Sequence, residues 1–285
     1  MAQKYSDDQL AEMADFYHEH GAVKLPGLVD PVWAQKVMAA IDHAIACYSD
    51  QRVPGVALSY GRGDGRMTIR YMWRENPLIR EFLFRDALAE PIAKISRSKE
   101  LRFWFDLTFV HEASAAGTAG EGSAWHHDIA AFPFKGEQLP SLWMAMTPAV
   151  EGQSRLEFID RSHKTVPGFY RPPTNTTADE NDGYITPPDF DALVRAGKEK
   201  ILAWDCQPGD AVMIHPYQLH GSKGNSGNAA HGRRVAMTSR WLGDDVRWLP
   251  TNPSMGKFVA GQSAEKPFLL GSRPEGEFFP LVWKA

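Results

Sequence analysis

The sequence predicts an α+β protein in which helices come first and a β sandwich or barrel follows. Apolar side chains repeat at helical spacing in the first hundred residues, whereas residues 101–245 divide into short β-type segments bounded by Gly and Pro. The chain of 285 residues is long enough for a sizeable core, and its 43% hydrophobic and 23% charged residues are typical of a globular protein.

The helical part has recognisable start and stop signals. Ser6 can cap a helix and Gly21 can end it, while Pro31 suits the first turn of another and Pro91 interrupts a third. We therefore expect helices over 6–20, 30–45 and 76–95, and a short strand over 22–25.

The β part follows as short segments separated by turn residues. The expected strands are 101–112, 124–131, 141–149, 155–159, 201–205, 211–215 and 234–242. Residues 113–123 are small and Gly-rich and should form a mobile loop, and residues 168–200 are polar enough for a lid or insert.

The chain has no internal repeat, so we expect a single domain over 1–285. Its parts would be a mainly helical region over 1–100, a β core over 101–245 with a variable insert over 168–200, and a C-terminal extension over 246–285.

The charge, the apolar runs and the cysteines limit the possible partners and compartments. A net charge of −4 gives no reason to expect nucleic acid or an anionic membrane. No apolar run is long enough to cross a bilayer, and the N-terminus lacks an apolar signal core. Cys47 and Cys206 form neither a disulfide framework nor a Cys-based zinc site, so we expect a reducing cytoplasm.

The most informative motif is Trp-His-His-Asp at 125–128. On a strand, His126 and Asp128 point to one face and His127 to the other. His220 follows a downstream strand and is favoured over His215 as a third ligand. Two imidazoles and one carboxylate leave coordination positions open, a set diagnostic for non-haem Fe(II) oxygenases. The remaining histidines considered are expected to be structural or surface residues: His43, His111, His163 and His231.

Two adjacent arginines, Arg233 and Arg234, begin the strand that comes after His220. An Arg at that position could bind a carboxylate with two parallel hydrogen bonds. The alternative is a solvated basic strand end, which would be the better interpretation of these two residues taken alone.

Together these motifs resemble the phytanoyl-CoA dioxygenase family of Fe(II)/2-oxoglutarate-dependent oxygenases. The resemblance extends over about residues 6–245 and rests on the segments 21–28, 125–128, 151–164, 208–222 and 233–241. It implies a double-stranded β-helix, a cupin-like jelly roll, with the N-terminal helices packed on one sheet. It also implies iron held by three ligands: His126, Asp128 and His220.

The resemblance further implies that an Arg and a hydroxyl bind the distal carboxylate of 2-oxoglutarate. Ser222 matches the family's hydroxyl. The family's strand carries a second Arg six residues after the first, so Arg240 favours Arg234 over Arg233. Two departures are a longer spacing between the distal His and this Arg, and His111 where many members carry Lys. Thr108, on the same expected strand as His111, is a further candidate for binding 2-oxoglutarate.

The implied activity decarboxylates 2-oxoglutarate to succinate and CO2 and uses O2 to oxidise a small organic metabolite. Halogenating relatives lack the carboxylate ligand, so Asp128 favours hydroxylation or a related oxidation. Two other functions stay open. A non-catalytic cupin-like binding protein would lack a functional co-substrate Arg or bind no iron, and a zinc metallohydrolase would give that Arg and Ser222 no evident purpose.

The substrate is the least defined part of the prediction. A partly apolar pocket could be lined by aromatic residues, although core packing is the better expectation for most of them: Trp104, Phe105, Phe132, Phe134 and Trp143. Arg62, Arg66 and Arg70 lie in a basic Gly-rich stretch that could contact an acidic substrate, although a solvated loop is favoured. No phosphate-binding glycine motif supports a CoA site.

Overall fold

The computed structural model describes residues 5–48, 57–60, 66–113, 122–171, 183–224, 232–250 and 269–285. The helices are α1 (Asp7–His20), α2 (Pro31–Tyr48), α3 (Met72–Glu75), α4 (Pro77–Leu83), α5 (Asp86–Ser96) and α6 (Phe190–Arg195), with 3-10 turns η1 (Asp128–Ala130) and η2 (Ser162–Lys164). The strands are β1 (Ala22–Leu25), β2 (Ala57–Tyr60), β3 (Arg66–Arg70), β4 (Glu100–His111), β5 (Ser123–His126), β6 (Phe134–Lys135), β7 (Ser141–Ala145), β8 (Leu156–Ile159), β9 (Ile201–Ala203), β10 (Ala211–Ile214), β11 (His220–Ser222), β12 (Arg234–Leu242), β13 (Arg247–Trp248) and β14 (Leu281–Lys284).

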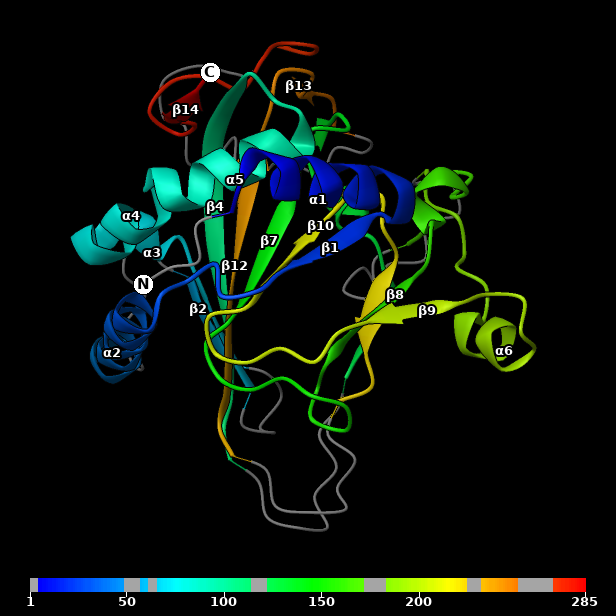
Figure 1. The fold of residues 1–285 in the computed structure, drawn as a ribbon, viewed down its shortest axis with the longest axis horizontal. Coiled ribbons are helices and arrows are strands. Elements are labelled where there is room, and N and C mark those ends of the chain that lie inside the picture. Colours follow the sequence, from blue (N-terminus) through cyan, green and yellow to red (C-terminus); the bar gives the residue numbers. More distant parts are fainter. Residues whose placement is uncertain are drawn as a thin grey trace.

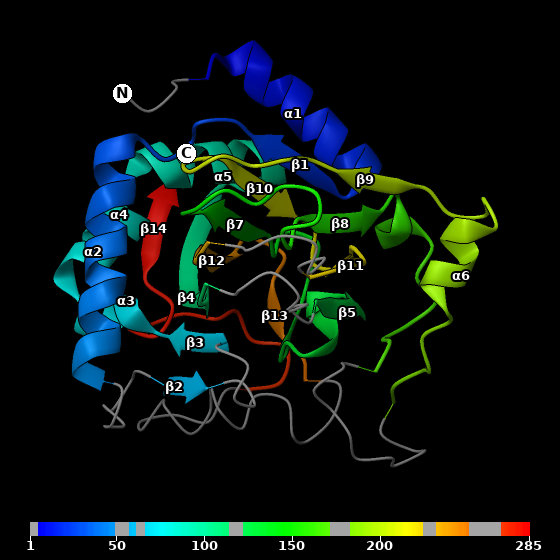
Figure 2. The ribbon, with the colours of Figure 1, turned by 90° about the horizontal axis from the view of Figure 1, so that it is seen from below.

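Most of the described strands form the two antiparallel sheets of a jelly roll, and β13 and β6 pair as a separate two-stranded sheet (Figures 1 and 2). The main sheet has the order β1-β10-β7-β12-β4-β3-β2, with β14 also paired to β4. The minor sheet has the order β5-β11-β8-β9. Apolar side chains of both sheets meet between them, for example Trp143 and Ala236 from the main sheet with Phe158 from the minor sheet. The predicted α+β class and jelly-roll core are therefore confirmed.

The helix signals act largely as the sequence suggests. Ser6 and Gln9 form a reciprocal capping box at the start of α1, and Gly21 ends this helix in the left-handed region at φ 83°. The helix expected over 76–95 is two helices, α4 and α5. The break between them lies at Phe84–Arg85 and not at Pro91, which lies inside α5.

Several expected strands are shorter than predicted, and others were missed. The segment 124–131 is a strand only as far as His126, after which the chain turns into η1. Strands β2 and β3 add two members to the main sheet that the sequence patterns did not indicate. The C-terminal extension contributes β14 to the same sheet, and the insert over 168–200 contains α6.

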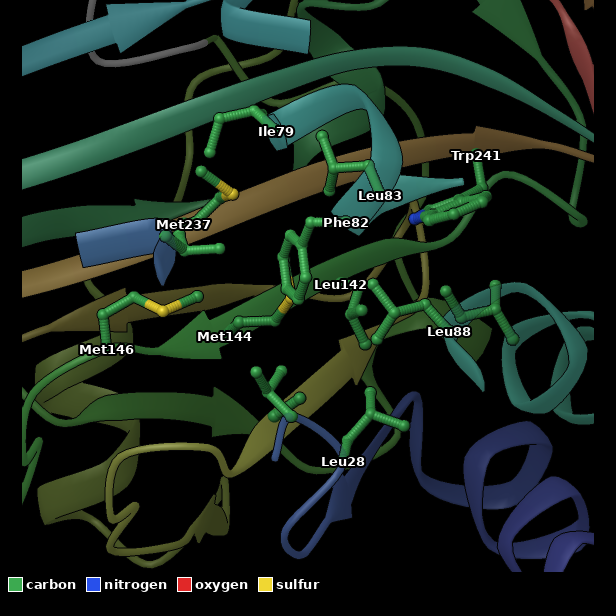
Figure 3. Close-up of a cluster of buried hydrophobic side chains, with 14 of the residues drawn as sticks. Leu28, Ile79, Phe82, Leu83, Leu88, Leu142, Met144, Met146, Met237 and Trp241 are labelled. Atoms are coloured by element: carbon green, nitrogen blue, oxygen red, sulfur yellow. The ribbon is translucent and has the colours of Figure 1, made fainter. Parts of the chain in front are cut away.

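The largest hydrophobic cluster joins the helices to one face of the main sheet (Figure 3). Phe82 and Leu88 from the helices are buried in it together with Met144, Met237 and Trp241 from β7 and β12. Because side chains alternate along a strand, the intervening residues of β12 point to the opposite face, toward the minor sheet. None of the described helices is long and apolar enough to span a membrane.

Candidate metal centre

Two neighbouring strands of the minor sheet bring His126 and His220 together. They are directly paired across β5 and β11, and their ring centroids lie 4.3 Å apart. Although β5 ends at His126, His127 keeps an extended backbone (φ −122°, ψ 140°), so Asp128 returns to the same side as His126. Ligand atoms of His126, Asp128 and His220 all lie within 4.8 Å of one another.

Both imidazoles are oriented by the backbone two residues earlier. The Nδ1 atom of His126 lies 2.8 Å from the carbonyl oxygen of Ala124, and that of His220 lies 3.0 Å from the carbonyl oxygen of Gln218. Because a carbonyl oxygen only accepts, each Nδ1 carries the hydrogen and each Nε2 keeps its lone pair for a metal. Burial lowers the pKa of His220 to about 4, which keeps this ring neutral.

Within the described part of the chain, both hydrogen-bonding partners of the Asp128 carboxylate act on one of its oxygens. Its Oδ2 accepts a hydrogen bond of 2.6 Å from the Ser141 hydroxyl and lies 3.0 Å from a guanidinium nitrogen of Arg240. Its Oδ1 lies 3.9 Å from Nε2 of His220, on the side where an ion would bind. Burial alone raises the pKa of Asp128, but Arg240 and the two imidazoles outweigh it and hold this pKa below its usual range.

Arg240 is itself buried, with its guanidinium 5.6 Å from the ring centres of both Phe105 and Phe132. Its Nε and one terminal nitrogen have no hydrogen-bond partner among the described residues. The sequence predicted that Arg240 shares a face of its strand with Arg234 but did not reveal its contact with Asp128. The only available signal was its even spacing from Arg234, which fixes a shared face.

The two adjacent arginines have opposite surroundings. Arg233 points outward and forms ion pairs with Asp42 on α2 and with Glu112. Arg234 points inward, with its guanidinium 5.6 Å from the ring centre of Trp143. Within the described part of the chain Arg234 has no carboxylate partner, and its Nε is buried without a hydrogen bond. Burial lowers its pKa to about 10.

The two hydroxyl candidates lie in different places. Ser222 is on β11, two residues after His220, and its hydroxyl accepts a 3.3 Å hydrogen bond from the amide of Gly224. Thr108 faces the helices instead, with its hydroxyl 3.9 Å from the sulfur of Met72. The structure therefore does not bring Thr108 to the face that Arg234 occupies.

Three other residues considered at the sequence level point away from the ligands or have other partners: His215, His127 and Arg70. Nε2 of His215 lies 2.9 Å from a carboxylate oxygen of Glu137, which explains why His215 does not compete with His220. Nε2 of His127 accepts a hydrogen bond from the amide of Tyr170. Arg70 is exposed on β3. Outside the described residues or side chains are Arg62, Arg66 and His231.

Most of the aromatic residues considered for a pocket are core residues. Trp104, Phe132 and Phe134 pack together in one cluster, and Trp143 packs between the sheets. Phe105 is half-buried beside two clusters. Core packing was the favoured expectation for most of this set.

A family model described as phytanoyl-CoA dioxygenase matches residues 17–235. No curated protein matches the chain. Among solved structures, it is similar to the epimerase SnoN in complex with Fe3+, alpha ketoglutarate and nogalamycin RO, with a TM-score of 0.73, 19% identity, and coverage of 98% of this chain and 100% of that chain.

It is also similar to the non-heme alpha ketoglutarate dependent carbocyclase SnoK from nogalamycin biosynthesis (TM-score 0.72, 18% identity, 99% of this chain and 100% of that chain). A third similar structure is EctD from S. alaskensis with 2-oxoglutarate and 5-hydroxyectoine (TM-score 0.67, 15% identity, 96% of this chain and 88% of that chain). At these identities the likeness establishes a shared fold.

Proposed function

The chain belongs to the phytanoyl-CoA dioxygenase family, and from this premise we propose that His126, Asp128 and His220 bind the iron of an Fe(II)/2-oxoglutarate-dependent dioxygenase. The donor set fits this metal, because two imidazoles that donate Nδ1–H to backbone carbonyls can each present Nε2 and the carboxylate of Asp128 presents Oδ1. The observation that carries the proposal is the joint presence, within one β sandwich, of these three ligand atoms and of Arg234, a cation with no carboxylate partner among the described residues.

The protein's own part in the reaction is to bind and orient. Arg234 would pair with the distal carboxylate of 2-oxoglutarate, and Ser222 would offer a hydroxyl to it. Arg240 and Ser141 occupy one oxygen of Asp128, which leaves the other to a single metal bond. When bound, the iron supplies the O2-activating chemistry.

A zinc metallohydrolase could use the same three ligands. However, the inward-pointing guanidinium of Arg234, which has no carboxylate partner in the described part of the chain, has no evident role in such an enzyme, whereas a dicarboxylic co-substrate would neutralise it. A non-catalytic cupin-like protein would bind no iron or lack a functional co-substrate Arg, so iron binding with 2-oxoglutarate and succinate formation separate it from an enzyme.

We further infer that the oxidised molecule is small and partly apolar. Leu107 and Phe109 are half-buried on the inner face of β4, and no core cluster of the described residues contains them. Both lie on the same face of β4 as Phe105. Phe105 is paired with Arg240, which contacts the metal ligand Asp128. An apolar row that starts at the reaction centre favours a substrate with an apolar surface. The retained Asp128 favours hydroxylation or another oxidation over halogenation.

The decisive experiment is an anaerobic titration with Fe(II) and 2-oxoglutarate, followed by admission of O2. We expect a weak visible charge-transfer band before O2 and succinate afterwards, with product from members of a metabolite library. Asp128→Ala and His126→Ala should lose the band while they keep the far-UV circular dichroism of the wild type. Absence of both band and succinate in the wild type would refute the oxygenase assignment and leave the zinc and binding-protein functions.

A further inference from the structure

The insert contacts residues that lie directly next to the metal ligands in sequence: Trp125, His127 and Leu219. The described residues of the insert are 168–171 and 183–200. Its helix α6 lies at the outer side of the minor sheet, next to β9 (Figures 1 and 2). The insert contacts the chain at residues one or two positions from the metal ligands, through hydrogen bonds and apolar packing.

The first contact is made by His127, which lies between the two ligands of β5 and η1. Its ring is 2% exposed, and its Nε2 accepts a 2.9 Å hydrogen bond from the amide of Tyr170. Because His127 points to the opposite side of the chain from His126 and Asp128, it can bind the insert without displacing either ligand.

The second contact is made by Tyr184, whose hydroxyl donates a 2.8 Å hydrogen bond to the carbonyl oxygen of Ala130. Ala130 is the last residue of η1, and Asp128 is the first. The Tyr184 hydroxyl therefore holds the turn that sets the direction of the carboxylate ligand.

Two further contacts complete the arrangement. The indole nitrogen of Trp125 donates a 3.0 Å hydrogen bond to Asp191 on α6. Leu219, which precedes the ligand His220, is 2% exposed in one apolar cluster with Tyr170 and Phe190. The insert thus contacts the chain immediately beside each of the three ligands.

The two described parts of the insert also hold each other. The amide of Arg171 donates to the carbonyl oxygen of Ile185 at 2.9 Å, and the amide of Ile185 donates to that of Phe169 at 2.8 Å. Tyr170 and Tyr184 are therefore held together by this backbone pairing. A change at the Tyr184 contact should also affect the contact between Tyr170 and His127.

We propose that Tyr184 and His127 are positioning residues, through which docking of the insert and metal binding at the three ligands stabilise each other. The proposal rests on the proposed function for the identity of the metal site. Coupling of this kind is reciprocal: docking of the insert raises the metal affinity by the same factor by which bound metal favours docking. A variant that loosens the insert should therefore lower the metal affinity.

The test compares Tyr184→Phe with Tyr5→Phe, each of which removes one hydroxyl. Tyr5 provides a matched control, because its hydroxyl also donates a 2.8 Å hydrogen bond to a backbone carbonyl, that of Pro26, far from the ligands. Binding of Co(II) to the full chain is followed by visible absorption. We expect Tyr184→Phe to weaken Co(II) binding about threefold to tenfold, the range for one net hydrogen bond, and Tyr5→Phe to leave it unchanged.

A second pair of variants tests His127. His127→Gln keeps a hydrogen-bond acceptor at about the position of Nε2 and should retain most of the Co(II) affinity. His127→Leu removes the acceptor and should weaken Co(II) binding by about the same factor as Tyr184→Phe. Hydrogen exchange gives an independent readout: Co(II) should slow exchange of the amides of Tyr170 and Ile185 in the wild type, and less so in Tyr184→Phe.

The outcomes separate the two proposals. If the wild type binds no Co(II) at these ligands, the proposed function fails and the coupling with it. If the wild type binds Co(II) but Tyr184→Phe and Tyr5→Phe behave alike, or if the exchange of the insert amides is indifferent to Co(II), the coupling is overturned and the metal site stands.

Discussion

Replacing Arg234 with Met should leave the ligand-free protein at least as stable as before and remove most of its affinity for 2-oxoglutarate. The usual result of deleting a buried charge is loss of stability, because a partner is left unpaired. Arg234 has no anionic partner in the described residues, so its removal leaves none behind. Methionine also keeps an apolar contact with the ring of Trp143.

The magnitude follows from the pKa of the guanidinium. Burial lowers it from 12.5 to about 10, which corresponds to about 3 kcal/mol of unfavourable desolvation. A carboxylate bound to Arg234 would offset a cost of that order. The dissociation constant for 2-oxoglutarate should therefore rise about 100-fold in Arg234→Met, and Tm without ligand should stay level or rise by a few degrees.

Two measurements check this. Thermal denaturation with and without 2-oxoglutarate gives the ligand-induced change in Tm, and an anaerobic titration of the Fe(II) protein gives the dissociation constant. The control is Arg233→Met, which loses surface ion pairs with Asp42 and Glu112 and should lower Tm slightly without changing 2-oxoglutarate binding. The reasoning is refuted if Arg233→Met carries the loss of affinity, or if Arg234→Met lowers the Tm of the ligand-free protein.

Arg240→Gln should lower the free energy of unfolding of the metal-free protein by about 3–5 kcal/mol in urea denaturation, because Asp128 loses its buried partner. Co(II) should restore part of the lost stability. Equal stability of the variant and the wild type without metal would contradict this prediction. Ser141→Ala, which removes only one hydrogen bond to Asp128, should cost about 1–3 kcal/mol in the same assay, and a larger loss than that of Arg240→Gln would reverse the assigned order. Burial raises the pKa of Asp106 to about 7, above its unfolded value, so its contribution to stability is full below about pH 4 and is lost as the pH rises through 7. Urea denaturation at pH 5 and pH 8 should show a smaller loss in Asp106→Asn than in the wild type, and identical losses would count against this assignment.

Local signals predicted the elements that depend on local chemistry. The capping residue Ser6 and the stop at Gly21 gave the bounds of α1 closely. Strand alternation predicted that His126, and not His127, lies on the same side of the chain as Asp128. The structure has this arrangement, although β5 ends before Asp128. That early end has a distant cause, because the amide of Ile129 bonds to the carbonyl oxygen of Pro216. No local pattern in residues 124–131 contains this information.

The rest of the site also depends on distant contacts. Arg240 and Ser141 reach Asp128 from two strands that only the folded sheet places beside it. Thr108 was placed on a strand correctly, but its face depended on a register that the sequence left open. The register is set by the pairing of Thr108 with Met237, which belongs to the helix-facing core.

The pairing of β12 with both β4 and β7 has a consequence for how the family varies. Ala236 is opposite Phe109 on one side and Ala145 on the other. The two neighbouring strands therefore fix the register of β12, and with it which of its side chains point inward. The number of residues between His220 and Arg234 is then free to drift in evolution, since insertions before the strand leave its inward and outward positions unchanged. Relatives should accordingly be aligned by the alternation of this strand, and not by counting from the distal histidine.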